Sequence, residues 1–599
     1  MISSNLSTPR LGGMPKSLAL LKAIGPYALL KFLMPGGTRI AILLWFYRHR
    51  HTKGHSGDSG HAGDTRHAAI PPAGGACASS RILVASAAAA LTAGCTVGPG
   101  FVRPEAPATA YSRSIRATSI TPGTFATSTA AAAATPQSFI YGGTIANDWY
   151  RLFKSDALDR LVRQALAGNP DLEGARHRLA AAQDELKAVS GAALPQIDAI
   201  NEIGRAHING SQLYAPVNAL HATGNRYEIG PSLAYNLDLF GGMRRSIESQ
   251  QAQTAAVRDQ LRDTYVTLVD QVVVTAFDYA AVQARIQVTR SLVSKLQAQY
   301  DLTVHLENAG KVIHSDTLQA QTQLENVRAT LPDLEQQRDA YRDALARLSG
   351  QTPDDFTMPP LTLADFTLPD QLPVSLPSAL VRQRPDVLAA EESLHAASAE
   401  IGMAEAARLP QLSLSAQYAQ QATRLNELFT QPGGVWSVGL GLAAPLLHGG
   451  TLAAREDEAK QRCAQALSAY RGTVISAFVD VADALQALQH DADSYTAHNR
   501  ALQAARANQE LAAAEYRAGK YTQLQVLTAE QQYQSAALTQ VQADMQRFTD
   551  TAALLRALGG GWWNASAGAL LGAAGADTPS NPSNPDRHYP IPSASSSHD

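Results

Sequence analysis

The amino-acid sequence predicts an α+β membrane protein built from a duplicated unit of strand, strand, long helix and second helix. Three observations support this prediction. The two halves share short motifs at a nearly constant offset, each half contains stretches of alternating apolar and polar residues, and these stretches lead into unusually long helical patterns. We therefore expect four strands and four long helical segments in each chain.

The composition of the 599-residue chain limits the possible classes of function. Lys and Arg number 49 and Asp and Glu 52, so no basic surplus points to nucleic acid as a partner. Hydrophobic residues make up 45% and aromatic residues only 6%, which favours helices rich in alanine and glutamine. Cys77, Cys95 and Cys463 lie too far apart for zinc spacing or a disulfide framework.

The N-terminal region has the composition of a lipoprotein signal preceded by an extension. Residues 81–94 contain a positive flank, Arg81, then an apolar run over 82–91 and small residues before Cys95. We interpret residues 1–80 as a leader extension that is disordered or lies upstream of the true start. Its five histidines leave a metal-binding tract as an alternative.

Cys95 is the predicted lipidation site. The segment Leu-Thr-Ala-Gly-Cys resembles the lipobox of bacterial lipoproteins, although Thr92 stands where leucine is usual. Residues 95–140 are rich in Thr, Ala and Ser and cannot bury enough apolar surface to fold alone, so they predict a lipid-anchored tether. The alternative is an alanine-rich run that ends by chance in Gly-Cys.

The internal repeat divides the remaining chain. We assign residues 141–355 to a first repeat of helix, β-hairpin and long helical hairpin, residues 356–563 to a second, and residues 564–599 to a disordered tail. Two motifs recur at an offset of 215 residues. They are Asn169-Pro170-Asp171 with Arg384-Pro385-Asp386, and Leu194-Pro195-Gln196 with Leu409-Pro410-Gln411.

Apolar and polar residues alternate over 227–239 in the first half and over 412–418 and 436–446 in the second, whereas 197–208 is the least regular strand. One face of each strand is apolar and the other is small and polar. A barrel with lipid outside and water inside shows this pattern, but so does a soluble sandwich. Four strands cannot close a barrel in lipid, so either the sheet is soluble or several chains pool their strands.

Helical patterns cover residues 243–301, 313–349, 451–516 and 522–558. At about 1.5 Å per residue, the first of these helices is roughly 90 Å long. Apolar positions in the last helix recur at alternating steps of three and four, which is the seam of a left-handed coiled coil. Gln531 and Gln534 dilute this seam, so part of it is expected to face water.

The long helices are expected to reverse at two Ala-Gly-Lys turns, which contain Gly310 with Lys311 and Gly519 with Lys520. Glycine adopts the left-handed conformation that ends a helix at little cost. Ser315 and Thr522 are candidate caps for the returning helices.

These features resemble the TolC-like outer-membrane efflux channels, and within them the NodT-type lipoproteins that serve as outer-membrane factors of resistance-nodulation-division (RND) pumps. The resemblance covers residues 95–563. The segments that carry it, besides the repeated motifs, are Trp149 with Phe153, Leu237-Asp238-Leu239-Phe240-Gly241, and Ala557-Leu558-Gly559-Gly560-Gly561-Trp562.

The resemblance implies a homotrimer in which each chain gives four strands to a 12-stranded β-barrel, continued by a periplasmic α-helical coiled-coil barrel. It implies a passive conduit that exports small molecules, such as drugs or toxic compounds, from the periplasm. The expected partners are a periplasmic adaptor, an inner-membrane transporter of RND type and outer-membrane lipid. No cofactor is expected beyond the lipid on Cys95.

The resemblance also implies a constriction near the helical turns, often lined by acidic side chains. Here only Asp316 is acidic, and Tyr521, Gln525 and Thr528 occupy the second half. We therefore expect a periplasmic gate held by packing and hydrogen bonds, with Asp316 and Lys520 as nearby charges. The alternative is that Asp316 stabilises a helix N-terminus through the helix dipole, worth about 0.3–1 kcal/mol.

No catalytic pattern is present, and we do not expect an enzyme. Gly559-Gly560-Gly561 lacks a Walker lysine and is interpreted as a helix stop. Cys463 is expected to be a packing residue, and His305, His314 and His395 to lie on solvated helix faces. The alternative functions are a soluble periplasmic coiled-coil scaffold with a small β-sheet, or a duct for type I protein secretion.

Overall fold

The computed structural model describes residues 96–105, 119–120, 132–209, 221–430 and 433–564, all of which belong to one compact unit. The predicted leader, signal and lipidation site Cys95 lie outside the described residues, as does nearly all of the predicted tail.

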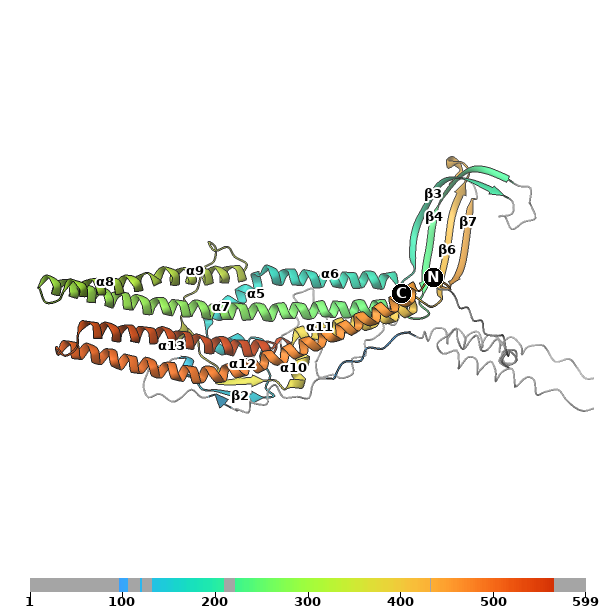
Figure 1. Cartoon of the computed structure of the whole chain (residues 1–599). Helices are drawn as coiled ribbons and strands as arrows, with labels where there is room; N and C mark the ends of the chain where they lie inside the picture. Colours follow the sequence, from blue (N-terminus) through green and yellow to red (C-terminus); the bar gives the residue numbers. More distant parts are fainter. Residues whose placement is uncertain (1–95, 106–118, 121–131, 210–220, 431–432, 565–599) are drawn as a thin grey trace, which may run out of the picture. The chain divides into compact units, whose positions relative to one another are not determined.

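The described part of the chain follows the predicted duplicated order (Figure 1). The first half contains α5 (Asp156–Gly168), α6 (Pro170–Ala192), β3 (Gln196–Asn209), β4 (His221–Leu237), α7 (Gly242–Asn308), α8 (His314–Arg328) and α9 (Thr330–Leu348). The second half contains α10 (Pro377–Gln383), α11 (Pro385–Ala406), β6 (Gln411–Ala422), β7 (Gly434–Ala443), α12 (Thr451–Arg517) and α13 (Gln523–Ala557). Helices α7 and α12 each contain 67 residues, which at about 1.5 Å per residue gives roughly 100 Å.

The two long helices begin in the same way. Gly241 and Gly450 precede them in the left-handed conformation, with φ of 81° and 83°. Because this conformation is strained for residues with a Cβ, glycine allows the chain to turn sharply from a strand into a helix. The equivalent glycines confirm that the repeat preserves this junction.

Four strands form an antiparallel sheet in the order β3-β4-β6-β7, which confirms one hairpin in each half (Figure 1). In the central pair, Leu233 lies opposite Ala416, and in the last pair Leu414 lies opposite Leu440. The apolar alternation is therefore in register across the strands. Within the described chain, β3 and β7 each have one unpaired edge.

The helix after the first turn is not continuous, which corrects the single helix expected over 313–349. Ala329 separates α8 from α9. Pro332 lies in the first turn of α9, where its missing N–H and its ring oppose an unbroken hydrogen-bond ladder. Helix α7 also extends to Asn308, seven residues beyond the predicted end at 301.

A second, smaller sheet was not predicted. It has the order β1-β2-β5 and consists of Ser119–Ile120, Gln137–Tyr141 and Gln371–Val374. Strand β2 pairs parallel to β5, and the predicted boundary between tether and first repeat falls inside β2. The strands are too short to show alternation, and their partners are distant in the sequence.

Within the main core, four phenylalanine rings from distant segments pack together. Phe277 of α7 packs edge-on against Phe153 and Phe366, with ring centroids 5.0 Å and 4.8 Å apart, and Phe548 of α13 lies 5.4 Å from Phe277. Helix α7 is apolar enough to cross a membrane, but 61% of its most apolar window is buried in the structure. Its apolarity is therefore explained by packing between helices.

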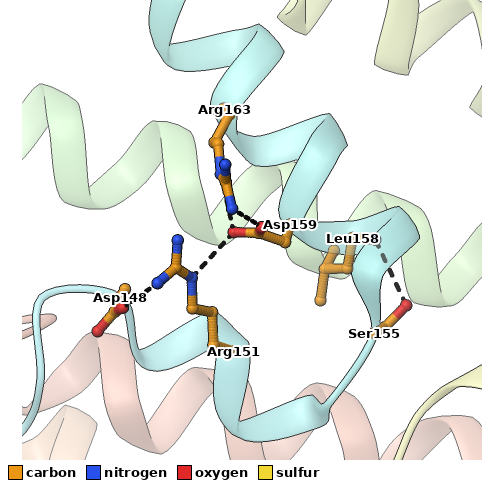
Figure 2. Close-up of polar contacts among 6 residues, drawn as sticks. All are labelled: Asp148, Arg151, Ser155, Leu158, Asp159 and Arg163. Carbon is orange, nitrogen blue, oxygen red and sulfur yellow. Dashed lines mark hydrogen bonds and ion pairs between the residues drawn. The ribbon is translucent and has the colours of Figure 1, made fainter.

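Helix α5 is fixed at its start by a small polar cluster (Figure 2). Ser155 is the N-cap and accepts a hydrogen bond from the backbone N–H of Leu158 at 3.4 Å. Asp159 accepts hydrogen bonds from the Nε atoms of Arg151 and Arg163 at 3.0 Å and 3.2 Å. Burial alone would raise the pKa of Asp159, but the two guanidinium groups lower it below its usual value.

Candidate functional site

The four-stranded sheet presents one strongly apolar face. On β7 the side chains of this face are 66–73% exposed, which is unusual for large apolar groups that occur in a row. They are Trp436, Val438, Leu440 and Leu442. The opposite face of β7 carries Ser437, Gly439 and Gly441. The sheet therefore has one face suited to lipid and one suited to water.

The water-compatible face contains a charge cluster around the buried Glu228, which was not predicted from the sequence. Glu228 of β4 accepts hydrogen bonds from Nε of Arg226 at 2.9 Å, from Nε2 of Gln421 at 2.9 Å and from the amide of Gln417. Arg226 also pairs with Glu202 of β3 at 3.3 Å. These contacts join three strands on one face. The sequence did contain a signal for this cluster, because Glu228 falls at a polar position of the alternating pattern over residues 227–239.

The two predicted turns adopt the expected conformation. Gly310 and Gly519 have φ of 66° and 76°, so both are left-handed. Lys311 and Lys520 are both exposed residues. Their backbone N–H groups donate hydrogen bonds to carbonyl oxygens of the preceding helices at 2.9 Å. Nζ of Lys520 also pairs with Oε2 of Glu515 at 3.0 Å, so this charge is already compensated.

In the second half, one of the gate candidates, Gln525, takes part in helix capping. Thr522 is the N-cap of α13, and its hydroxyl oxygen accepts a hydrogen bond from the backbone N–H of Gln525 at 3.4 Å. In return, Oε1 of Gln525 accepts a hydrogen bond from the backbone N–H of Thr522 at 2.7 Å. The hydroxyl of Thr528 donates to the carbonyl oxygen of Leu524 at 2.9 Å, and Tyr521 is partly buried. The prediction that Thr522 is a cap is confirmed.

In the first half, Ile313 is the N-cap of α8 and makes no side-chain cap, so the prediction that Ser315 caps this helix is wrong. Ser315 is the second residue of α8. Asp316 lies in the first turn and is partly buried. No hydrogen bond or ion pair in the described part of the chain joins Asp316 to the candidates in the second half.

The region assigned to a tether contains an ordered stretch, residues 96–103, which we call the N-terminal segment. The N–H of Val97 donates to the carbonyl oxygen of Phe240 at 3.0 Å. Arg245 of α7 donates through Nε to the carbonyl oxygen of Val97 and through Nη2 to that of Gly98, both at 3.1 Å. Arg103 pairs with Glu391 of α11. This stretch folds by packing on two helices, which the composition did not predict.

His395 belongs to the same contact and is not on a solvated face, which corrects the sequence prediction. Its Nε2 lies 3.1 Å from Oε1 of Glu248, and its Nδ1 lies 3.5 Å from Oε2 of Glu392. Burial alone would lower the pKa of His395, but the hydrogen bonds and charges of the two glutamates raise it to about 9. The imidazolium is therefore the form held against α7 at neutral pH.

Other candidate residues have structural surroundings. Cys463 is partly buried against the main core, and burial raises the pKa of its thiol. The three glycines at 559–561 have positive φ and follow the end of α13, so they form a helix stop. Among the described residues no group of three or more His, Cys, Asp or Glu could hold a metal ion.

Comparison with known proteins identifies the family. The sequence profile described as outer membrane efflux protein matches residues 161–351 and 376–560, which include the four-stranded sheet and both long helical hairpins. The chain belongs to the outer membrane efflux protein family. This assignment places it in the outer membrane as the channel of a tripartite efflux system.

Relatives of this efflux protein span most of its length. It is 28% identical over 501 residues to the probable efflux pump outer membrane protein TtgC of Pseudomonas putida KT2440, covering 81% of this chain and 96% of TtgC. It is 26% identical over 419 residues to the cation efflux system protein CusC of Escherichia coli O6:H1, covering 69% and 88%. The solved outer-membrane channel OprN superposes with a TM-score of 0.67 at 29% identity, covering 78% of this chain and all of OprN.

Proposed function

We propose that three copies of this chain form a passive conduit in which each contributes β3, β4, β6 and β7 to a closed 12-stranded barrel. The observation that carries this proposal is the four-stranded sheet itself, with two unpaired edges and an exposed apolar face. In lipid, each unsatisfied backbone group at an edge costs several kcal/mol. Joining the β7 edge of one copy to the β3 edge of the next removes every edge.

Three-fold closure also accounts for the polar face of the sheet. With the apolar face toward lipid, the face that carries Ser437 and the Glu228 cluster surrounds a water-filled lumen. The long helices α7 and α12 start within a few residues of the strands and continue the lumen as a tunnel through the periplasm. The chain carries out no chemistry in this proposal, and an energised transporter supplies the driving force.

We place the partner contacts at the helical turns. Ile313 and Leu524 are 68% and 61% exposed there, beside the turns at Gly310 and Gly519. Exposed apolar side chains of this size favour a protein partner, which fits a periplasmic adaptor that joins the channel to an inner-membrane transporter of RND type. The cargo class in this proposal is small toxic molecules.

The same turns are the proposed site of the gate. Asp316 supplies one partly buried acidic group per chain, hence three in a trimer, at the start of α8. Thr522 and Gln525 stiffen the start of α13 by mutual capping, and Tyr521 adds an aromatic ring next to it. A constriction built from these residues depends mainly on packing and hydrogen bonds.

Detergent extraction of outer membranes tests the assembly. The conduit predicts a trimer that survives SDS without heating and dissociates when heated. Recovery of a monomer from the periplasmic supernatant would instead favour a soluble scaffold. Labelling with [³H]palmitate tests the proposed lipid in the same preparation, because label in the wild type and none in Cys95→Ala is expected.

A further inference from the structure

One offset of 209 residues relates the two long helical hairpins to each other. It relates both ends of α7, residues 242 and 308, to both ends of α12, residues 451 and 517. It also relates Gly350, which follows α9 with a φ of 70°, to Gly559, which follows α13 with a φ of 97°. The two hairpins are therefore equivalent residue by residue, and a contact in one half predicts a contact at the same place in the other.

The long helices differ in their neighbours. Helix α7 packs against α6 and α9 from its own half and against α11 and α13 from the other half. Helix α12 packs against α11 and α13 from its own half, but neither α6 nor α9 packs closely on it within the described chain. One flank of α12 therefore lacks the neighbours that the equivalent flank of α7 has.

The uncovered flank of α12 contains large apolar side chains. Ile475 and Val479, one helical turn apart, are 65% and 49% exposed. Their equivalents in α7 are Val266, which is 4% exposed, and Asp270, whose Oδ2 lies 3.3 Å from Nε of Arg556 of α13. Side chains that are covered on α7 thus correspond to side chains that stay exposed on α12 in a single chain.

The cover of Val266 shows what would cover Ile475. A Cβ built on Gly560, just after α13, would lie 3.5 Å from Cβ of Val266. The backbone N–H of Gly560 donates to the carbonyl oxygen five positions earlier at 3.1 Å, and the N–H of Gln351 does the same after α9 at 2.9 Å. Gln351 is therefore the equivalent of Gly560, and it is exposed. The repeat pairs Ile475 with Gln351.

A ring of copies brings these two surfaces together. Within one chain the second half follows the first, and its α11 and α13 cover one flank of α7. Around a three-fold axis the first half of the next copy follows the second half of this one, so its α6 and α9 cover the flank of α12. A closed ring repeats one such interface at every junction. The sheet has the same order, because β7 of one copy meets β3 of the next.

The charges of the two surfaces are complementary. Arg471 is exposed one turn before Ile475, and its equivalent Arg262 stacks on Trp562 beyond the end of α13, with Cζ 4.1 Å from the ring centroid. The corresponding stretch beyond α9 carries the exposed Asp354 and its neighbour at 355, also an exposed aspartate. Within the described chain no ion pair joins Arg471 to either carboxylate. A basic group on one surface therefore meets acidic groups on the other.

We propose that Arg471, Ile475 and Val479, which we call the α12 flank, form an interaction surface for a second copy of this chain. The flank receives the end of the partner's α9 and the segment after it, residues 347–355. The partner's Gln351 packs on Ile475, and the acidic group at 354 lies near Arg471. This inference rests on the proposed trimer and adds a helical interface that closure of the sheet does not require.

Cross-linking of the full-length protein in outer membranes tests the contact. The double variant Gln351→Cys/Ile475→Cys is expected to form a covalent trimer on oxidation, because a disulfide joins Cβ atoms about 3.5–4.5 Å apart. Ser476→Cys combined with Gln351→Cys is the matched control, since Ser476 is exposed but rotated by about 100° around the helix. Each single cysteine variant controls for reaction with Cys463.

Charge reversal tests the same surface without a cross-link. Arg471→Glu and Asp354→Arg are each expected to lower the temperature at which the trimer dissociates in SDS, because each places like charges across the contact. The double variant Arg471→Glu/Asp354→Arg is expected to restore the wild-type temperature, since opposite charges face each other again. Additive losses in the double variant would overturn the proposed pairing of the two surfaces.

The outcomes separate this interface from the conduit. A heat-modifiable trimer in which Gln351→Cys/Ile475→Cys forms no covalent trimer, or no more than the Ser476→Cys control, overturns the helical interface and leaves the barrel standing. A covalent trimer that conducts no ions in planar bilayers supports the interface and overturns the conduit. A wild-type chain recovered only as a periplasmic monomer overturns both.

Discussion

The ring of Phe101 stacks on the ring of His395, with centroids 4.4 Å apart and planes inclined by 16°. Phe101 belongs to the N-terminal segment, which follows the predicted lipidation site, and His395 belongs to α11. The stack therefore connects the N-terminal segment to the helix that precedes β6. An imidazolium held by Glu248 and Glu392 also attracts the aromatic face above it.

This stack predicts a pH-dependent attachment of the N-terminal segment. The folded pKa of His395, about 9, lies above its ordinary 6.5, so the stabilisation is complete below about 6.5 and is lost as pH rises through about 9. Proteolysis by chymotrypsin after Phe101 is expected to accelerate over this window. His395→Gln should be cleaved rapidly at all pH values, and exposed His490→Gln should behave as the wild type. Equal cleavage in His395→Gln and the wild type would contradict the prediction.

Close packing at Gly402 gives a second prediction for the same contact. A Cβ at Gly402 would lie 2.8 Å from the carbonyl oxygen of Val97 and 2.9 Å from Cγ of Arg245. Gly402→Ala should therefore release the N-terminal segment and cost about 1–3 kcal/mol, the usual range for overpacking. Thermal unfolding of the detergent-solubilised protein measures the loss.

Gly472→Ala is the matched control for Gly402→Ala. Gly472 lies inside α12, and a Cβ there meets no atom within 4 Å. Alanine should stabilise this helix by about 0.5–1 kcal/mol, because glycine loses more conformational entropy on folding. A melting temperature lowered by both substitutions would show that the effect at Gly402 is not specific to the N-terminal segment.

The sequence predicted most clearly the features that depend on local chemistry. Gly310 and Gly519 marked both turns because a left-handed residue is required there, and the alternation around Leu233 and Leu440 placed the strands. The contacts of His395 were not predicted. A buried charge on a helix has the same periodicity as an exposed one, and only tertiary partners distinguish them.

The two faces of β7 predict opposite tolerance to charge. Leu440 lies on the apolar face, whereas Ser437 lies on the polar face of the same strand. If the sheet forms a barrel in lipid, Leu440→Arg should cost about 2–4 kcal/mol near the bilayer midplane and reduce the yield of heat-modifiable trimer. Ser437→Arg should assemble normally. Equal yields of the two variants in outer membranes would argue against the barrel.

The substitution Asp316→Asn distinguishes two roles for this residue, one in the gate and one at the N-terminus of α8. As a gate residue, its three copies place negative charge where the tunnel narrows, so Asp316→Asn should weaken block by divalent cations and change resting conductance. As a helix-terminus residue, the same substitution should only destabilise α8, by about 0.3–1 kcal/mol. Bilayer recordings with added cations measure the first effect and thermal unfolding the second.

Asp333 provides the control for Asp316, because it lies in the first turn of α9, away from the helical turn. Asp333→Asn should cause a similar small loss of stability through the helix dipole without any change in cation block. If Asp316→Asn matches Asp333→Asn in both measurements, Asp316 stabilises α8 only. The constriction would then depend on the residues near Tyr521, whose packing does not require a charge.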